Sequence, residues 1–269
     1  VRFRDADGRR AFTVPFAAAS QDPRLAALDQ MTFAEWLDGE GFEDPGLRWL
    51  TRYASRDDYG TEPEQLSAWY GLAYFASRAE ANAAESAPFV AWPEGNARIA
   101  AHLAEAVGVD RVRTGQVVTQ VQPRGGRSRC RVQTLDADGR SVVYAARSVV
   151  FALPSYLRPY LLPEPLRGAY APEYAPWVVS NVHLSGRPSY RGFETAWDNV
   201  IVDSDALGYV VATHQGGSAY GPTVWTHYIA GSGADARAER SRVGTLSWRD
   251  ATDAVFNDLA RAHLDLERF

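Results

Sequence analysis

Residues 177–184 read Trp-Val-Val-Ser-Asn-Val-His-Leu, a run rich in β-branched and aromatic residues that is typical of a strand. Three similar runs follow after short connections, at 197–202, 208–213 and 222–230. The connection from Asp203 to Gly208 is too short for a parallel crossover, which takes about a dozen residues or more. These strands therefore predict a mixed or antiparallel sheet.

On the N-terminal side of this sheet, the pattern between about residues 22 and 107 is helical. Thr32-Phe-Ala-Glu35 is a capping box, so a short helix is expected to begin there and to end near Gly39 or Gly41. Apolar residues then recur at spacings of three and four. The further helices expected are one after Pro45, one over 63–81, and one over 95–107 that turns Ile99, Leu103 and Val107 inward.

Between the helical region and the sheet, short β-branched runs occur at 111–113, 116–122, 129–135, 141–145 and 147–153. An Asp-Gly turn at 136–139 joins two of them, and the same turn chemistry at 5–8 predicts a hairpin near the N-terminus. A helical pattern returns from about Ser247 to His263. Strands and helices do not alternate as a parallel sheet requires, so the fold class is predicted to be α+β.

The composition excludes several classes of protein. The chain has 269 residues, 46% of them hydrophobic, which is incompatible with a disordered chain. The net charge is −5 and all 28 basic residues are arginine, without a basic run, so we expect no nucleic-acid partner. The apolar runs are far shorter than the ~20 residues of a membrane helix. The single cysteine permits no intrachain disulfide, and the compartment and oligomeric state stay open.

The sequence contains no convincing motif for a metal site, a hydrolase or a dinucleotide-binding site. The five histidines form no HxxxH pair, so no metal site is expected. Asp203 and Asp205 are interpreted as a solvated turn rather than a glycosidase pair. Gly231-Ser-Gly-Ala-Asp-Ala236 is interpreted as a turn rather than a dinucleotide site, because the preceding strand is not apolar on both faces and residues 237–242 are too charged for a helix packed on a sheet.

Three other stretches are more specific, and they occur in a characteristic order. They are Trp92-Pro-Glu-Gly-Asn-Ala-Arg-Ile99, then Gly115-Gln-Val-Val-Thr-Gln-Val121 before the Asp-Gly hairpin, then Ser148-Val-Val-Phe-Ala-Leu-Pro154. Together they resemble the middle of the flavin-containing amine oxidoreductases, the superfamily of monoamine and polyamine oxidases and phytoene-desaturase-like proteins. Leu66-Ser-Ala-Trp-Tyr70 resembles a helix of that family's substrate domain.

The resemblance implies a two-lobed FAD protein, with residues 1–90 and 156–269 as substrate-binding domain and 91–155 as part of the FAD domain. Val118 matches the residue whose backbone meets the adenine, although an ordinary strand valine would explain it equally well. Ala152, Leu153 and Pro154 match the strand end beside the cofactor. The family's GxGxxG would precede Val1, so we expect a fragment that does not itself retain FAD.

The family's oxidases usually carry a lysine in the strand that matches 177–184, and Ser180 occupies the aligned position. The resemblance therefore makes Ser180 the candidate catalytic position and favours a dehydrogenase, desaturase or isomerase over an oxidase. Candidates to line an aromatic substrate cavity are Trp69, Tyr70, Tyr74, Trp225 and Tyr228, each of which could instead be core packing. The leading interpretation is the substrate-binding portion of an FAD-dependent oxidoreductase that moves a hydride to flavin from a C–H bond of a small molecule, beside an amine or along an unsaturated chain. The alternative is a non-catalytic α+β ligand-binding or interaction module.

Overall fold

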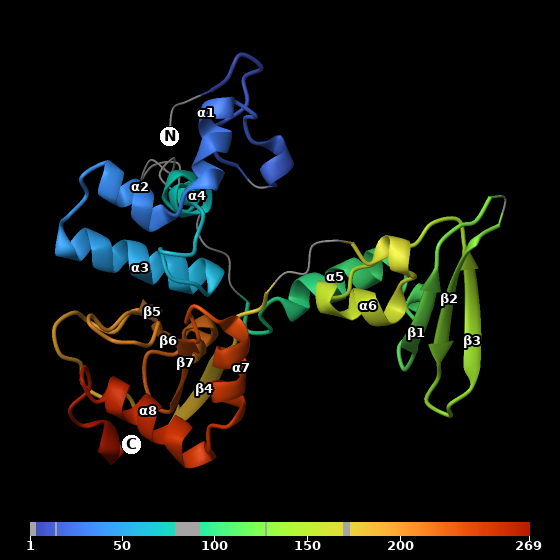
Figure 1. Ribbon diagram of the computed structural model, residues 1–269. Helices are drawn as coiled ribbons and strands as arrows, with labels where there is room; N and C mark the ends of the chain where they lie inside the picture. Colours follow the sequence, from blue (N-terminus) through green and yellow to red (C-terminus); the bar gives the residue numbers. More distant parts are fainter. Residues whose placement is uncertain (1–3, 14, 79–91, 127, 169–172) are drawn as a thin grey trace. The chain divides into compact units, whose positions relative to one another are not determined.

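The computed structural model describes residues 4–13, 15–78, 92–126, 128–168 and 173–269 (Figure 1). The chain separates into two compact units, which are described one at a time. Unit 1 combines 1–93 with 174–269, and unit 2 is 94–173. No helix among the described residues is long and apolar enough to span a membrane.

The N-terminal half of unit 1 is helical. Its helices are α1 (Pro23–Ala26), α2 (Phe33–Gly39), α3 (Pro45–Tyr59) and α4 (Ala68–Arg78). The capping box that begins α2 is confirmed, because Thr32 and Glu35 exchange side-chain to backbone hydrogen bonds. Asp44 caps α3 and Gly60 ends it with a φ of 63°, a conformation that glycine adopts without strain.

The start of α4 differs from the prediction. Residues 63–66 form a turn, and Ser67 makes an isolated β-bridge with Thr32, so the helix begins at Ala68 instead of Pro63. The backbone groups of this segment are used in pairing with the start of α2, since Phe33 N–H donates to the Leu66 carbonyl. The predicted end near Ala81 lies outside the described residues.

The C-terminal half of unit 1 contains the predicted sheet, and its antiparallel pairing is confirmed. The strands β4 (Trp177–Leu184), β7 (Thr223–Ala230), β6 (Gly208–Val211) and β5 (Asp198–Asn199) lie side by side in this order. The run at 197–202 yields only the two residues of β5, and β6 gives way to a 3-10 turn after Val211. Together with the helices, the sheet confirms the α+β class.

Helix α8 (Trp248–Leu259) covers one face of this sheet. Its Val255 and Leu259 pack into a core with Val182, Trp225 and other apolar side chains of the strands. The segment before it was expected to be too charged for a helix packed on a sheet, and the helix that it forms buries none of its residues. Residues Ala236–Gly244 form α7, capped by the Asp235 carboxylate and carrying an ion pair between Glu239 and Arg242. The charges are tolerated because no residue of α7 is buried.

Unit 2 contains α5 (Ala97–Val107), β1 (Val117–Gln122), β2 (Cys130–Leu135), β3 (Ser141–Ala146) and α6 (Arg158–Leu161). Its three strands form an antiparallel sheet in the order β1-β2-β3, with the predicted hairpin between β2 and β3. The strands expected at 111–113 and 147–153 do not form. A strand needs a hydrogen-bonded neighbour, and no described residue supplies one for these segments.

The apolar stripe of α5 also differs from the prediction. Ile99, Leu103 and Val107 do share one side of the helix, but all three are exposed. Among the described residues of unit 2, only Val121 and Thr134 are buried. The sequence pattern therefore predicted an amphipathic helix correctly, but the prediction that its apolar side is buried was wrong.

Candidate functional site

The two faces of the unit 1 sheet differ in how they are covered. Because alternate residues of a strand point to opposite faces, Val182 and Leu184 face α8, whereas their neighbours face away from it. We call the second side the open face, defined by Trp177, Val179, Asn181, His183, Val224, Thr226 and Tyr228. The first four are exposed, with 55% of Val179 accessible, and the last three are half-buried. Four of the seven side chains are apolar or aromatic, and accessible apolar surface of this kind is typical of a binding site.

Aromatic rings and one carboxyl group give the open face its chemistry. The Trp177 and Tyr228 rings meet edge to face, with centroids 5.9 Å apart. Asp198 is paired with Val210, and Val210 with Thr226, so the Asp198 side chain belongs to the same face. Asp198 is exposed as a whole, but partial burial of its carboxyl group raises the pKa of this side chain.

Asp198 also links the sheet to the tyrosines of the helices. Burial, followed by the charges of Asp57 and Asp198, raises the pKa of Tyr53 on α3, and Tyr74 on α4 contributes in the same direction. Burial and Asp198 likewise raise the pKa of Tyr228. A carboxylate among aromatic rings is an arrangement that can hold an organic ammonium group.

The predicted aromatic residues therefore do not share one surface. Trp69 is buried in a separate core against Phe12 and Phe16, at centroid distances of 5.3 and 4.8 Å. Tyr70 is exposed on the same helix. Trp225 and Tyr228, three positions apart on β7, point to opposite faces of the sheet. Tyr74 acts electrostatically on Tyr53, and Asp198 acts electrostatically on both Tyr53 and Tyr228.

Ser180 lies on the covered face, directly opposite His227 of β7. His227 is fully buried and its Nε2 lies 2.9 Å from Oδ2 of Asp258 on α8, while Ser204 donates to Oδ1 at 2.5 Å. Burial alone would raise the pKa of Asp258, but the hydrogen bonds from His227 and Ser204 outweigh it and lower the pKa. Sequence reasoning missed this network because its members come from three separate segments of the chain.

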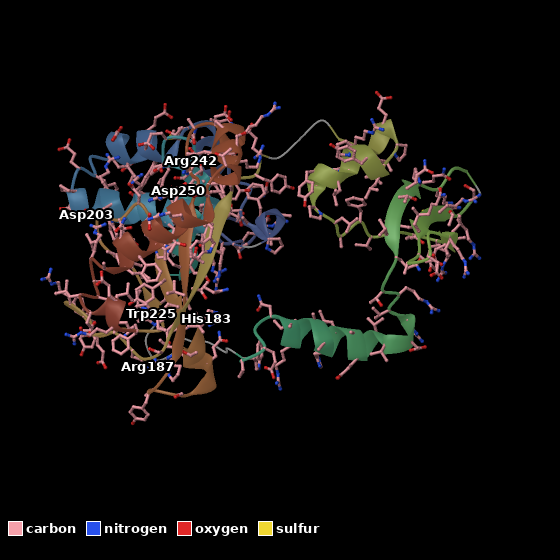
Figure 2. All side chains as sticks on the ribbon, turned by 90° about the horizontal axis from the view of Figure 1, so that it is seen from below. His183, Arg187, Asp203, Trp225, Arg242 and Asp250 are labelled. Atoms are coloured by element: carbon pink, nitrogen blue, oxygen red, sulfur yellow. The ribbon has the colours of Figure 1, made fainter. Side chains whose placement is uncertain are left out.

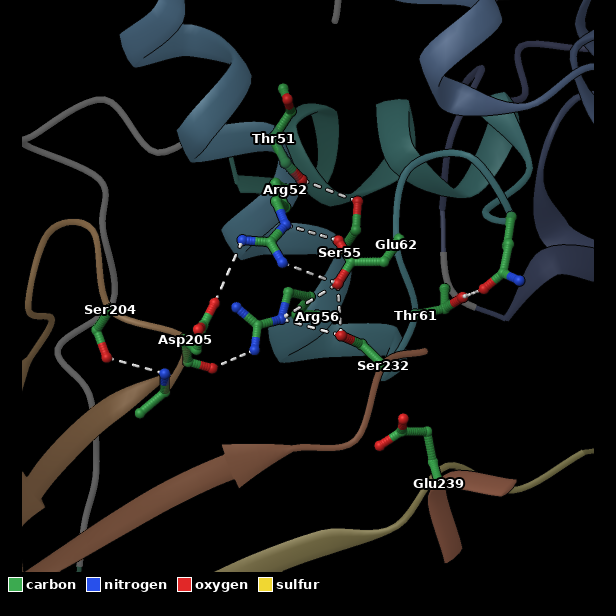
Figure 3. Close-up of polar contacts among 12 residues, drawn as sticks. Thr51, Arg52, Ser55, Arg56, Thr61, Glu62, Ser204, Asp205, Ser232 and Glu239 are labelled. Carbon is green, nitrogen blue, oxygen red and sulfur yellow. Dashed lines mark hydrogen bonds and ion pairs between the residues drawn. The ribbon is translucent and has the colours of Figure 1, made fainter. Parts of the chain in front are cut away.

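A second polar network joins α3 to the sheet (Figure 3). Arg56 is only 5% exposed, and its Nε donates to Ser232 Oγ at 3.1 Å while its Nη2 donates to the Asp205 carbonyl. The Ser232 hydroxyl donates to Glu62 at 2.6 Å, and Arg52 pairs with the same carboxylate at 2.8 and 3.2 Å. The network fixes the helical half of unit 1 against the loops at one end of the sheet.

The glycine-rich loop at 231–236 tests whether the chain can hold the pyrophosphate of FAD. A Cβ added at Gly233 would lie 2.7 Å from Oε1 of Glu239, and one at Gly231 would lie 3.1 Å from Oε2. The side chain of Glu239 thus fills the space that a phosphate would need, and it carries the same charge sign. The loop follows β7, which is antiparallel to its neighbours, whereas a dinucleotide-binding loop follows a parallel strand. The loop at 231–236 therefore does not fit the pyrophosphate of FAD.

The positions matched to the adenine side of FAD lie in unit 2. Val118 is half-buried on β1, which is an edge strand, and the pairing with β2 slips by one residue between Val118 and Gln120. An edge strand leaves backbone groups for a ligand. Ala152, Leu153 and Pro154 form irregular backbone, and Leu153 lines a cavity of about 420 Å³.

In the described part of the chain, no three His, Cys, Asp or Glu side chains lie close enough together to hold a metal ion.

Comparison with known proteins does identify the family. A search of curated proteins returned no match. The model of the family described as "Flavin containing amine oxidoreductase" matches residues 8–188, more than half of the chain. The chain therefore belongs to the flavin-containing amine oxidoreductase family.

Proposed function

We propose that unit 1 is the substrate-binding part of a flavin-dependent oxidoreductase and that its open face receives the substrate. Unit 2 would contribute to the FAD-binding part through the Val118 backbone and residues 152–154. A bound flavin would accept a hydride from a C–H bond of the substrate, beside an amine or along an unsaturated chain. The observation that carries the proposal is a sheet covered by α8 on one face and left aromatic and accessible on the other.

The chemistry of the open face favours an amine. Tyr228 and Trp177 provide aromatic surface, and the Asp198 carboxylate on the same face would gain a counter-ion from an ammonium group. We propose that Asp198 holds the charge of the amine while Tyr228 contacts its apolar part. Tyr53 and Tyr74 complete the aromatic surroundings on the side of the helices.

The absence of lysine from the chain bears on the electron acceptor. Ser180, which the resemblance aligns with the lysine of the family's oxidases, points to the covered face against His227 and away from the open face. We propose that oxygen is a poor acceptor for this protein and that the reaction is a dehydrogenation coupled to another acceptor.

The test uses the full gene product that contains this chain, reduced anaerobically with a panel of primary and secondary amines. Asp198→Asn is expected to weaken apparent amine binding about tenfold, equivalent to ~1.4 kcal/mol, because the ammonium loses its counter-ion. Tyr228→Ala should also weaken binding. Asp138→Asn, in the exposed hairpin of unit 2, and Tyr220→Ala, in an exposed loop, are the matched controls.

Two outcomes would contradict the proposal. A colourless gene product, or one whose flavin no amine reduces, would favour the alternative of a non-catalytic ligand-binding module. Equal binding of amines by the Asp198→Asn variant and by the wild type would place the substrate away from the open face.

A further inference from the structure

A cavity of about 590 Å³ lies at one end of the unit 1 sheet, away from the open face. Its walls come from the segment after β4, with Arg187 and Trp197, and from Val211 and Trp225 of β6 and β7. Figure 2 shows Arg187 and Trp225 together at this end of the sheet, while Asp203, Arg242 and Asp250 lie toward the opposite end. Its volume is within the range of small-molecule sites, ~300–1,000 Å³.

Three of the lining residues, Arg187, Thr195 and Trp225, carry a buried side-chain N or O atom that no described residue satisfies, and two of these atoms can only donate. Trp225 is 1% exposed, and its indole Nε1 has no hydrogen-bond partner. The Nε of Arg187 is also buried without a partner, while Nη2 of the same guanidinium donates to the Ser218 carbonyl at 2.7 Å. Leaving a buried donor unpaired is costly, so such groups generally have a bound water or ligand.

The chemistry of these donors selects the class of ligand. The indole N–H and the guanidinium can only donate, so both require an acceptor and neither accepts from an ammonium group. The guanidinium is also positively charged and matches the planar geometry of a carboxylate. Pro188, Ala196 and Val211 give part of the wall an apolar surface, which suits a hydrocarbon body, and Ser189, His214 and Ser218 make another part polar. Glu194 also lines the cavity, and its negative charge opposes every anion, a monocarboxylate less than a multiply charged phosphate.

We propose that this cavity binds a small organic monocarboxylate, with its oxygens accepting from Arg187 and Trp225. The Trp225 ring is held for this role by the covered-face core. It stacks on Tyr209 at 4.6 Å, and Tyr209 in turn is hydrogen-bonded to His263 Nε2 at 2.7 Å. The site is separate from the open face and does not depend on the proposed oxidoreductase function.

The test is a titration of the 269-residue chain with benzoate, followed by NMR of ¹⁵N-indole-labelled tryptophan. The Trp225 indole signal is assigned by its loss in Trp225→Phe. We expect it to shift saturably as benzoate binds, because its N–H gains an acceptor. Arg187→Ala should weaken binding at least tenfold, whereas Arg249→Ala, an exposed arginine of α8, should leave it unchanged.

Benzylamine and inorganic phosphate serve as the comparison probes, and neither should bind as tightly as benzoate. Because Arg187→Ala also removes the contact with Ser218, Arg187→Lys is the second variant: it keeps the charge but loses the planar fork, and should weaken benzoate binding severalfold. The absence of a saturable shift at Trp225 would overturn the proposal. So would equal affinity for benzylamine, or unchanged benzoate binding in both Arg187 variants.

Discussion

Replacing Arg56 by alanine should destabilise unit 1 by about 3 kcal/mol. The change removes hydrogen bonds from a buried guanidinium to Ser232 and to the Asp205 carbonyl, each worth ~1.5–3 kcal/mol when a charged group takes part. In the wild type, the stability that these hydrogen bonds provide is partly offset because burying the guanidinium is itself unfavourable. The same desolvation lowers the pKa of Arg56. Glu62 keeps its pair with Arg52 in the variant, so no carboxylate is left unpaired.

The measurement is urea unfolding followed by tryptophan fluorescence, together with a thermal scan. A loss of about 3 kcal/mol corresponds to a fall in Tm of roughly 6–12 °C for a chain of this size. Arg249→Ala is the control and should change the free energy of unfolding by less than about 0.5 kcal/mol. A double-mutant cycle with Ser232→Ala should give a coupling of about 1 kcal/mol. A loss below about 1 kcal/mol for Arg56→Ala would refute the view that this network joins the two halves of unit 1.

Three further predictions concern the sheet and its loops. Ser180→Lys should cost about 2–4 kcal/mol in urea unfolding, because it places a charge against α8 and buried His227, whereas Val179→Lys on the open face should be nearly neutral; similar stabilities would mean that the faces are misassigned. The pKa of Asp258 is lower in the folded state than its unfolded value of about 3.8, so its ionised form contributes stability above that value, and this stability is lost as pH falls through the lower folded pKa. Asp258→Asn should therefore make the free energy of unfolding less dependent on pH between about pH 5 and 2. An unchanged pH dependence would contradict this. The purified chain should lack stoichiometric FAD in its absorbance spectrum, because Glu239 fills the glycine-rich loop; a flavin spectrum at one equivalent would show that another phosphate site exists.

Local signals predicted the elements whose stability is decided locally. The Thr32–Glu35 capping box identified the start of α2, since the groups that satisfy the first turn lie within a few residues, and the apolar spacing after Pro45 identified α3. The alternation in 177–184 and the short connections identified an antiparallel sheet. Where a segment depends on a distant partner, the same reasoning failed, as at 147–153, which has strand composition but no neighbour to pair with.

The candidate site was less predictable for the same reason. Tyr228 and Trp225 are both aromatic residues of one strand, and only their position relative to α8 separates an open-face residue from a core residue. Asp198 carried no signal in the sequence, because its importance comes from the burial and the tyrosines around it. The charge of 237–242 argued against a helix packed on a sheet, which agrees with the lack of buried residues in α7, but it did not exclude an exposed helix.

The near absence of buried side chains in unit 2 has a consequence for how this part of the protein could evolve. Among the described residues of this unit only Val121 and Thr134 are fully buried, so the hydrophobic free energy that it gains by folding alone is small. We expect such a segment to transfer poorly between proteins as an autonomous module. Substitutions elsewhere in the protein that stabilise it would be selected together with substitutions in residues 94–173.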